Sequence, residues 1–243
     1  MPDRGKVGRR YGDGTRIMGV ALEAFAIRLR HIKSSKIIRE CLQRLPDDDV
    51  YPDAPSDITV ISPLIDETLF LKRPKLHPDF LGTGLLPKLM LHEAETMELL
   101  LRNPHLHIVR YHGCLIKRGR IVSLVLDRLP ITLQHRLEKN SQHFDVEDCM
   151  NKIKAAVQHL HSLGLAHNDL TPMNIMVDKC DDPVIIDYDS FQPFGNTLIT
   201  AGTLGWFDED FTEPARKHDE IALKKIRIWA EKLTRAAQDP KIG

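Results

Sequence analysis

The stretch LAHNDLTPMNIMVDKCDDPVIIDYDS, residues 165–190, constrains the fold of this chain more than any other part of its sequence. Two short β-branched runs within it, NIMVD and PVIID, are flanked by aspartate, a pattern that predicts a tight β-hairpin with polar side chains at its ends. Asp169, Asn174 and Asp187 follow one another at intervals of five and thirteen residues. Each lies next to a strand or a turn, where its side chain is free to act away from the backbone.

These three residue types suit the transfer of a phosphoryl group from ATP. Mg²⁺ prefers hard oxygen ligands, and the reaction depends on positioning and on neutralisation of charge. We expect Asp187 and Asn174 to share the metal, while Asp169 orients the attacking hydroxyl. Taken singly, each residue is also what turns and caps favour. The joint spacing of the three residues favours a role in phosphoryl transfer over a role in turns and caps.

At these residues the sequence resembles the protein kinase family. The catalytic loop H-R-D-L-x-x-x-N of that family reads His167-Asn168-Asp169-Leu170-Thr171-Pro172-Met173-Asn174 here, and the metal motif D-F-G reads Asp187-Tyr188-Asp189. Short, divergent members such as the fungal kinase-like proteins are the nearest resemblance. It covers about residues 58–233 and implies an α+β, two-lobed protein-kinase-like fold, with a small mixed N-lobe and a mainly helical, truncated C-lobe. The corresponding domains are an N-terminal extension, partly helical, at 1–50, the N-lobe at 51–128 and the short C-lobe at 129–243.

The resemblance also implies a nucleotide site made from both lobes. Lys72 and Glu93 stand where the family has the ion pair that holds the α- and β-phosphates. Leu126 stands at the gatekeeper position, and the backbone of Asp127 and Leu129 is expected to meet adenine. The implied catalytic residues are thus Asp169, Asn174, Lys72 and Glu93, the nucleotide-binding residues are Lys72, Leu126, Asp127, Leu129 and Asp187, and the metal ligands are Asn174 and Asp187. The implied cofactors are ATP and Mg²⁺.

Ordinary interpretations of the N-lobe residues stay open. Lys72 is also what a solvated strand lysine would look like, and Glu93 is one of three glutamates, with Glu95 and Glu98, that suit an exposed helix face. Farther along, AGTLGWFDED resembles the segment of protein kinases that precedes their peptide-docking region. It would put Thr203 near the substrate and next to Asp169. Asp219 matches the aspartate that anchors the following helix.

Several positions depart from the family pattern. No G-x-G-x-x-G precedes Lys72, so the glycine-rich lid over the phosphates is not recognisable. The glycines of GDG at 12–14 and GTG at 82–84 do not flank a strand as such a lid requires. Asn168 replaces the arginine of the catalytic loop, Thr171 replaces its lysine, and Asp189 replaces the glycine of the metal motif.

Hydrophobic periodicity predicts the remaining elements. Apolar residues at helical spacing predict helices at 15–45, 85–101 and 146–164, the last with Met150, Ile153, Val157 and Leu160 on one face. Strand patterns lie at 58–65, 68–73, 108–116 and 120–127. Beyond Leu129–Pro130 the period becomes helical.

Composition excludes some classes of partner and environment. Lys plus Arg and Asp plus Glu both number 34, so no net field attracts nucleic acid or an anionic membrane, and we expect neither as a partner. The four cysteines are far apart and form no C-x-x-C pair, which favours free thiols in a reducing, intracellular compartment, cytoplasmic or nuclear. The apolar run at 17–29 is too short and too charged to span a bilayer.

The leading functional hypothesis is a protein kinase that moves the γ-phosphoryl group of Mg-ATP to a Ser/Thr hydroxyl of a protein substrate. A small-molecule kinase similar to choline or aminoglycoside kinases is an alternative, because H-N-D-L-x-P-x-N also fits their loop. A pseudokinase that binds partners without turnover is the third, favoured by the missing glycine loop.

Overall fold

A computed structural model of the chain describes residues 45–61, 66–76, 78–188, 192–195, 197–198, 202–208 and 211–238. The expected helix at 15–45 and most of the expected extension at 1–50 therefore lie outside the described residues. From Pro46 onward the chain forms one folding unit, to which the following description applies. Within the described residues, no helix has the length and apolar character needed to cross a membrane.

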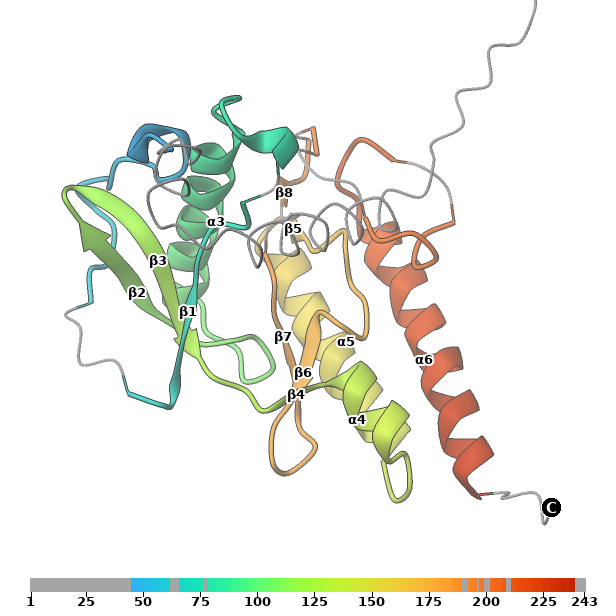
Figure 1. Cartoon of the computed structure of the whole chain (residues 1–243). Coiled ribbons are helices and arrows are strands. Elements are labelled where there is room, and N and C mark those ends of the chain that lie inside the picture. Colours follow the sequence, from blue (N-terminus) through green and yellow to red (C-terminus); the bar gives the residue numbers. More distant parts are fainter. Residues whose placement is uncertain are drawn as a thin grey trace, which may run out of the picture. The chain divides into compact units, whose positions relative to one another are not determined.

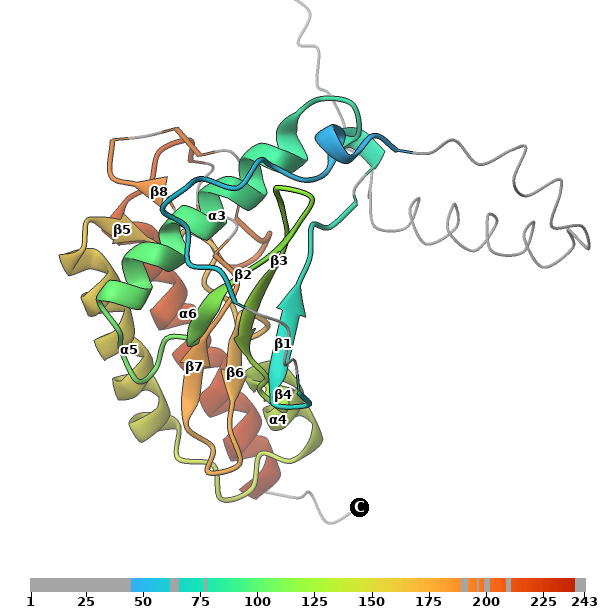
Figure 2. The same cartoon turned by 90° about the vertical axis from the view of Figure 1, so that its left-hand side faces the viewer.

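The first part of this unit is a small antiparallel sheet with one long helix against it. Strand β1 (Leu69–Lys72) pairs with β3 (Arg120–Asp127), and β3 pairs with β2 (Tyr111–Lys117), so the order is β1-β3-β2. Helix α3 (Leu85–Arg102) lies across the sheet beside β2 and β3 (Figures 1 and 2). Short 3₁₀ turns, η1 (Asp47–Asp49) and η2 (Pro78–Phe80), precede β1 and α3, respectively.

Apolar side chains at helical spacing explain how α3 packs. Leu86, Met90, Ala94, Met97 and Leu100 are buried, and they recur every three or four residues, which places them on one face. The helix starts after Gly84, whose positive φ of 71° suits a residue without a Cβ. The GTG segment thus forms the turn before α3 and does not flank a strand.

The second part is mainly helical. Short helix α4 (Leu133–Lys139) and the longer α5 (Val146–Ser162) are capped by Thr132 and Asp145, whose side chains accept hydrogen bonds from backbone N–H groups of the first turn. Helix α6 (Arg216–Gln238) runs beside α5 (Figure 1). The four residues expected on one face of α5, Met150, Ile153, Val157 and Leu160, are all buried, which confirms that prediction.

Small β elements join these helices to the site. Strand β6 (Ile175–Val177) forms the predicted hairpin with β7 (Pro183–Ile185), and β4 (Ile131–Thr132) extends it on the other edge of β6. Strands β5 (Leu165–Ala166) and β8 (Gln192–Pro193) form a separate pair. One continuous apolar core runs from α3 through the first sheet to α5, the hairpin and α6. The predicted α+β, kinase-like architecture is confirmed.

The strand expected at 58–65 is shorter than predicted where the structure describes it. Residues 58–61 contribute only a single bridge, from Val60 to Cys114, and residues 62–65 lie outside the described part. Thr59 pairs with β2 through its carbonyl, which accepts the backbone N–H of Cys114 at 2.7 Å, and the backbone N–H of Ile61 donates to the carbonyl of Cys114 at 3.1 Å. The backbone N–H and the hydroxyl of Thr59 donate instead to the carboxylate of Glu98, at 2.8 and 2.9 Å.

Candidate active site

The β6–β7 hairpin places Asn174 and Asp187 at its open end. The backbone N–H of Ile186 donates to the carbonyl of Asn174 at 2.9 Å, one step beyond the paired residues Ile175 and Ile185. The carboxyl side chain of Asp187 therefore follows directly after a backbone pair with Asn174. Asp187 has a positive φ of 65°, which turns the chain away from the hairpin at this residue.

Asp169 is held by hydrogen bonds from two directions. The amide of Asn174 donates to its backbone carbonyl at 2.8 Å and to its Oδ2 at 3.1 Å. The backbone N–H of Thr203 donates to its Oδ1 at 2.6 Å. Each carboxylate oxygen of Asp169 thus accepts a hydrogen bond, which fixes the orientation of the side chain. The expected contact between Thr203 and Asp169 is made by the backbone of Thr203.

The loop that carries Asp169 is anchored to helix α6. The fully buried carboxylate of Asp219 accepts hydrogen bonds from the backbone N–H groups of His167 and Asn168, both at 2.9 Å, and contacts Nε2 of His161 at 2.8 Å. Asn168 has a positive φ of 63°, a conformation that asparagine tolerates better than most residues. Its amide donates to the carbonyl of Ala166 at 2.9 Å, so this polar side chain is satisfied locally.

Lys72 links the two parts of the unit. Its Nζ lies 2.5 Å from Oε1 of Glu93 on α3 and 2.6 Å from Oδ1 of Asp187 after β7. The side chains of Lys72 and Glu93 are only 13% and 6% exposed, so this lysine is a buried member of a charged cluster and not a solvated strand lysine. Burial alone would raise the pKa of the Asp187 carboxyl, but the nearby charges of Lys72 and Lys75 and their hydrogen bonds outweigh it and hold the pKa below its ordinary value.

Tyr188, in place of the phenylalanine of the metal motif, fills the space behind Asp187. It is 1% exposed, and its ring lies 6.1 Å from that of His167. Its hydroxyl donates to the carbonyl of Ile185 at 2.8 Å, and burial raises its pKa, so it remains a neutral donor. His167 contacts the carbonyl of Ile186 at 3.2 Å and therefore braces the loop from behind.

A cavity of about 460 Å³ opens beside this cluster. Leu126, at the expected gatekeeper position, and Asp127 and Leu129, whose backbone is expected to meet adenine, all line it. Lys72 and Asp187 line another part, and the remaining lining residues are Phe70, Arg73, Lys75, Val109, Arg128, Met176 and Ile186. All residues expected at the nucleotide from both lobes therefore border one space, together with Glu93 through its contact to Lys72.

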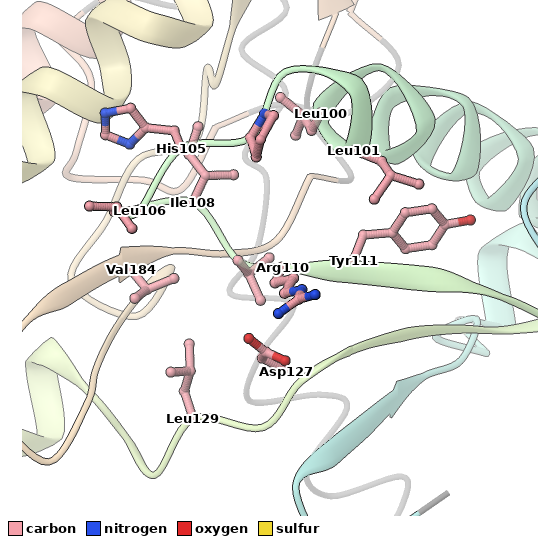
Figure 3. Close-up of a pocket in the computed structure, with 12 residues that line it drawn as sticks. Leu100, Leu101, His105, Leu106, Ile108, Arg110, Tyr111, Asp127, Leu129 and Val184 are labelled. Atoms are coloured by element: carbon pink, nitrogen blue, oxygen red, sulfur yellow. The ribbon is translucent and has the colours of Figure 1, made fainter. Parts of the chain in front are cut away.

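A second, larger cavity of about 620 Å³ lies along the end of α3 and the segment that leads into β2. Figure 3 shows Leu100 and Leu101 at the end of α3, with Val184 and Leu129 also bordering the space. Asp127 and Leu129 line both cavities, whereas Lys72 and Asp187 do not line this one. Its lining is mostly apolar.

Four contacts near the site were not foreseen from the sequence. Lys75 also contacts Asp187, with Nζ 3.2 Å from Oδ2. Glu98 is buried and accepts a bond from the hydroxyl of Tyr111 at 3.0 Å as well as those from Thr59. Lys225 on α6 holds the segment after Thr203, because its Nζ lies 2.8 Å from the carbonyl of Phe207 and 2.7 Å from Oδ1 of Asp208. Nε2 of His161 contacts the carboxylate of Asp219, which also holds the loop of Asp169. None of these side chains stands in a motif, so only their positions in the fold identify them.

The fold and the site together define the class. A small antiparallel sheet packs against one helix and adjoins a mainly helical part. A cavity is lined by Lys72 and Asp187, and Lys72 also contacts Glu93. The loop in which Asn174 donates to Asp169 adjoins them, because the carbonyl of Asn174 accepts the backbone N–H of Ile186. This is the architecture of a protein kinase. The family described as protein kinase domain matches residues 83–213, more than half of the 243-residue chain. This chain belongs to the protein kinase domain family. The matched range begins after Lys72, which the structure nevertheless places against Glu93.

Three curated fungal proteins are similar to this chain. The serine/threonine-protein kinase/endoribonuclease IRE1 of Hypocrea jecorina is 30% identical over 147 residues, which is 50% of this chain and 12% of that protein. The protein ireA of Aspergillus fumigatus, with the same description, is 31% identical over 80 residues, 30% of this chain and 7% of that protein. The sensor for unfolded proteins in the ER ire1 of Schizosaccharomyces pombe is 26% identical over 125 residues, 42% of this chain and 12% of that protein. The similarity thus spans about an eighth or less of each relative.

Proposed function

We propose that this chain is an ATP-dependent protein kinase that transfers the γ-phosphoryl group of Mg-ATP to a Ser/Thr hydroxyl of a protein. The observation that carries the proposal is the ion-pair cluster of Lys72 with Glu93 and Asp187, whose Lys72 and Asp187 line the same cavity as Leu126, Asp127 and Leu129. The hydrogen-bonded pair of Asp169 and Asn174 adjoins this cluster, because the carbonyl of Asn174 accepts the backbone N–H of Ile186, next to Asp187. General chemistry assigns a distinct role to each part of this arrangement.

The donor set fits a magnesium ion. Asp187 offers a carboxylate that stays ionised because its pKa is held low. Asn174 uses its amide nitrogen on Asp169, and its Oδ1 accepts no hydrogen bond from the described residues, which leaves this hard oxygen for a metal. Mg²⁺ bound by these two residues would neutralise charge on the transferring phosphate.

The opposite side of the cavity fits adenine. The backbone N–H of Asp127 donates to the carbonyl of Arg110 at 3.0 Å and is occupied. The N–H of Leu129 has no hydrogen-bond acceptor among the described residues, so it is available to a ring nitrogen. Apolar side chains of Val109, Leu126 and Met176 border the same space and suit the faces of a purine.

Asp169 is placed to act on the acceptor hydroxyl. Its two carboxylate oxygens are fixed by Asn174 and by the backbone of Thr203, so it can accept or orient a proton without reorganisation. The contact with Thr203 supports a protein acceptor, since residues 202–208 match the segment that adjoins the peptide substrate in the family. The names of two relatives include serine/threonine-protein kinase, which supports the choice of hydroxyl.

The test is incorporation of radiolabelled γ-phosphate by the purified full chain. We expect transfer from Mg-ATP to the chain itself or to a mixed Ser/Thr peptide library, with none to a tyrosine library. Parallel reactions with EDTA, and with the Asp169→Asn variant, exclude a contaminating kinase. Transfer to choline or an aminoglycoside instead would establish the small-molecule alternative. Mg-ATP binding with no transfer to any acceptor would establish a pseudokinase and reject the proposal.

A further inference from the structure

Lys75 places a second ammonium group on the carboxylate expected to bind the metal. It lies three residues after Lys72, in the segment that leaves β1. Its Nζ is 3.2 Å from Oδ2 of Asp187, whereas Nζ of Lys72 is 2.6 Å from Oδ1. Each oxygen of Asp187 therefore faces a different lysine.

The two lysines differ in exposure. The side chain of Lys72 is 13% exposed, and that of Lys75 is 72% exposed. An exposed ion pair contributes at most about 1 kcal/mol to folding, so stabilisation of the fold accounts for little of this arrangement. A long, solvated side chain with one end at the site is able to exchange partners when a ligand enters.

The charge around Asp187 shows what Lys75 supplies. The ammonium group of Lys72 contacts the carboxylates of Glu93 and Asp187, and that of Lys75 contacts the carboxylate of Asp187. A polyphosphate bound against Asp187 through a divalent ion would bring more negative charge to this cluster. The ammonium group of Lys75, which lies 3.2 Å from Oδ2 of Asp187, would be within reach of that added charge.

The site needs such a group because of what the sequence omits. The family covers the phosphates with a glycine-rich loop, and no G-x-G-x-x-G occurs in this sequence. In the described sheet, β1 is an edge strand, and the segment with Lys75 leaves from its end. Lys75 lines the 460 Å³ cavity together with Lys72 and Asp187.

We propose that Lys75 is a second phosphate-binding lysine, which contacts the polyphosphate chain of the nucleotide where the family uses the glycine-rich loop. This inference rests on nucleotide binding in the proposed function, and it does not require turnover. When Asp187 binds a divalent ion, Lys75 exchanges that carboxylate for the phosphates.

Calorimetric titration of the full chain with adenosine, AMP, ADP and ATP, all with Mg²⁺, tests the proposal. Lys75→Met should weaken ATP binding by about tenfold, the size of one lost charge-assisted hydrogen bond, and should leave adenosine binding unchanged. Lys75→Arg keeps the charge and should retain most of the affinity. Lys88→Met removes another exposed lysine, on α3, that does not line the cavity, and this variant should bind ATP like wild type.

Two results would overturn the inference while leaving the proposed function in place. One is ATP affinity that is unchanged in Lys75→Met, and the other is an equal loss for adenosine and ATP. If wild-type protein binds no nucleotide at millimolar concentration, the proposed function fails, and the inference fails with it.

A double-mutant comparison separates direct contact from an effect through Asp187. ATP binding is measured in EDTA for Asp187→Asn with and without Lys75→Met. A direct contact predicts that loss of Lys75 still weakens binding when residue 187 is neutral. If the lysine acted only by pairing with Asp187, the two proteins would bind ATP equally, and the proposal would be wrong. Melting curves confirm that each variant is folded.

Discussion

The side chain of Asp219, on helix α6, accepts a 2.9 Å hydrogen bond from the backbone N–H of Asn168 in the catalytic loop, fifty-one residues earlier in the chain. The same carboxylate holds the N–H of His167, so two successive backbone groups of the loop depend on one side chain. Asn168 in this loop has a positive φ, a left-handed backbone conformation that is sparsely populated unless the surrounding structure holds it. The position of Asp169 is therefore set by a helix that does not itself border the cavity of about 460 Å³.

Removal of this anchor should destabilise the fold. Asp219→Ala leaves two backbone donors and His161 without their buried acceptor, and we expect a loss of about 3–5 kcal/mol in the free energy of unfolding. Urea denaturation followed by circular dichroism measures it. Glu231→Ala, on the same helix, removes a carboxylate in an exposed pair with Arg235 and should cost less than about 1 kcal/mol. Similar losses in both variants would show that Asp219 is not an anchor.

Substitution of Asp169 and substitution of Asp187 should impair activity in different ways. Asp169→Asn keeps the shape of the side chain and removes its charge, so kcat should fall by about 10²-fold or more while Mg-ATP still binds. Asp187→Asn removes the proposed metal ligand and should weaken Mg-ATP binding as well. Steady-state kinetics and thermal shift with Mg-ATP, against ATP with EDTA, distinguish the two effects. An Asp169→Asn protein as fast as wild type would contradict the role given to Asp169.

Stability should decline toward acid pH through His105. Burial and the neighbouring rings of His159 and His107 lower its pKa in the folded state. The unfolded chain therefore binds the proton more readily, and stability is lost as pH falls from about 6.5 through the lowered folded value. His105→Gln should lose less stability than wild type between pH 7.5 and 5.5. His135→Gln, at an exposed position of α4, is the control and should follow wild type. Equal slopes for all three proteins would exclude His105 as a contributor.

Thiol reactivity should differ sharply among the described cysteines. Burial raises the pKa of Cys114 to about 11 and that of Cys149 to about 12, while Cys180 is exposed in the β6–β7 turn. Iodoacetamide at pH 8 should modify Cys180 in the native protein and leave the two buried thiols intact until the chain is unfolded. Peptide mapping by mass spectrometry follows each site separately, including Cys41, which lies outside the described residues. Rapid native labelling of Cys114 would contradict its burial.

Much of the fold was accessible from the sequence because its elements have strong local patterns. The strand at 120–127, the helix over 85–101 and the hairpin of NIMVD and PVIID were predicted within one or two residues of their observed bounds. The stretch at 58–65 has the same composition as a strand. Its described part pairs with β2 only at Cys114, and the backbone N–H of Thr59 goes to Glu98, a long-range contact that no local pattern contains.

In the candidate site, too, the residues in recognisable motifs could be predicted from the sequence, and the residues that act through long-range contacts could not. Lys72, Glu93, Asp169, Asn174 and Asp187 stand in motifs with fixed spacing, and the structure brings them together; their chemical roles stay predictions. Lys75 and Lys225 act through contacts with residues 112 and 18 positions away, respectively, and have no motif. Glu98 resembles any helix-surface glutamate in the sequence, and only the buried Tyr111 and Thr59 reveal that it faces inward.

The two buried glutamates of α3 have a mechanical consequence. Glu93 meets Lys72 at the site, whereas Glu98, five residues later, is fixed to Thr59 and to Tyr111 of the sheet. The end of the helix near Glu98 is thus fastened to the sheet by neutral donors that do not depend on the nucleotide. Any displacement of α3 that separates Glu93 from Lys72 must then be a swing of the first turns about a fixed pivot, and not a sliding of the whole helix. A probe attached near Lys88 would travel through a wide arc, while one near Arg102 would hardly move.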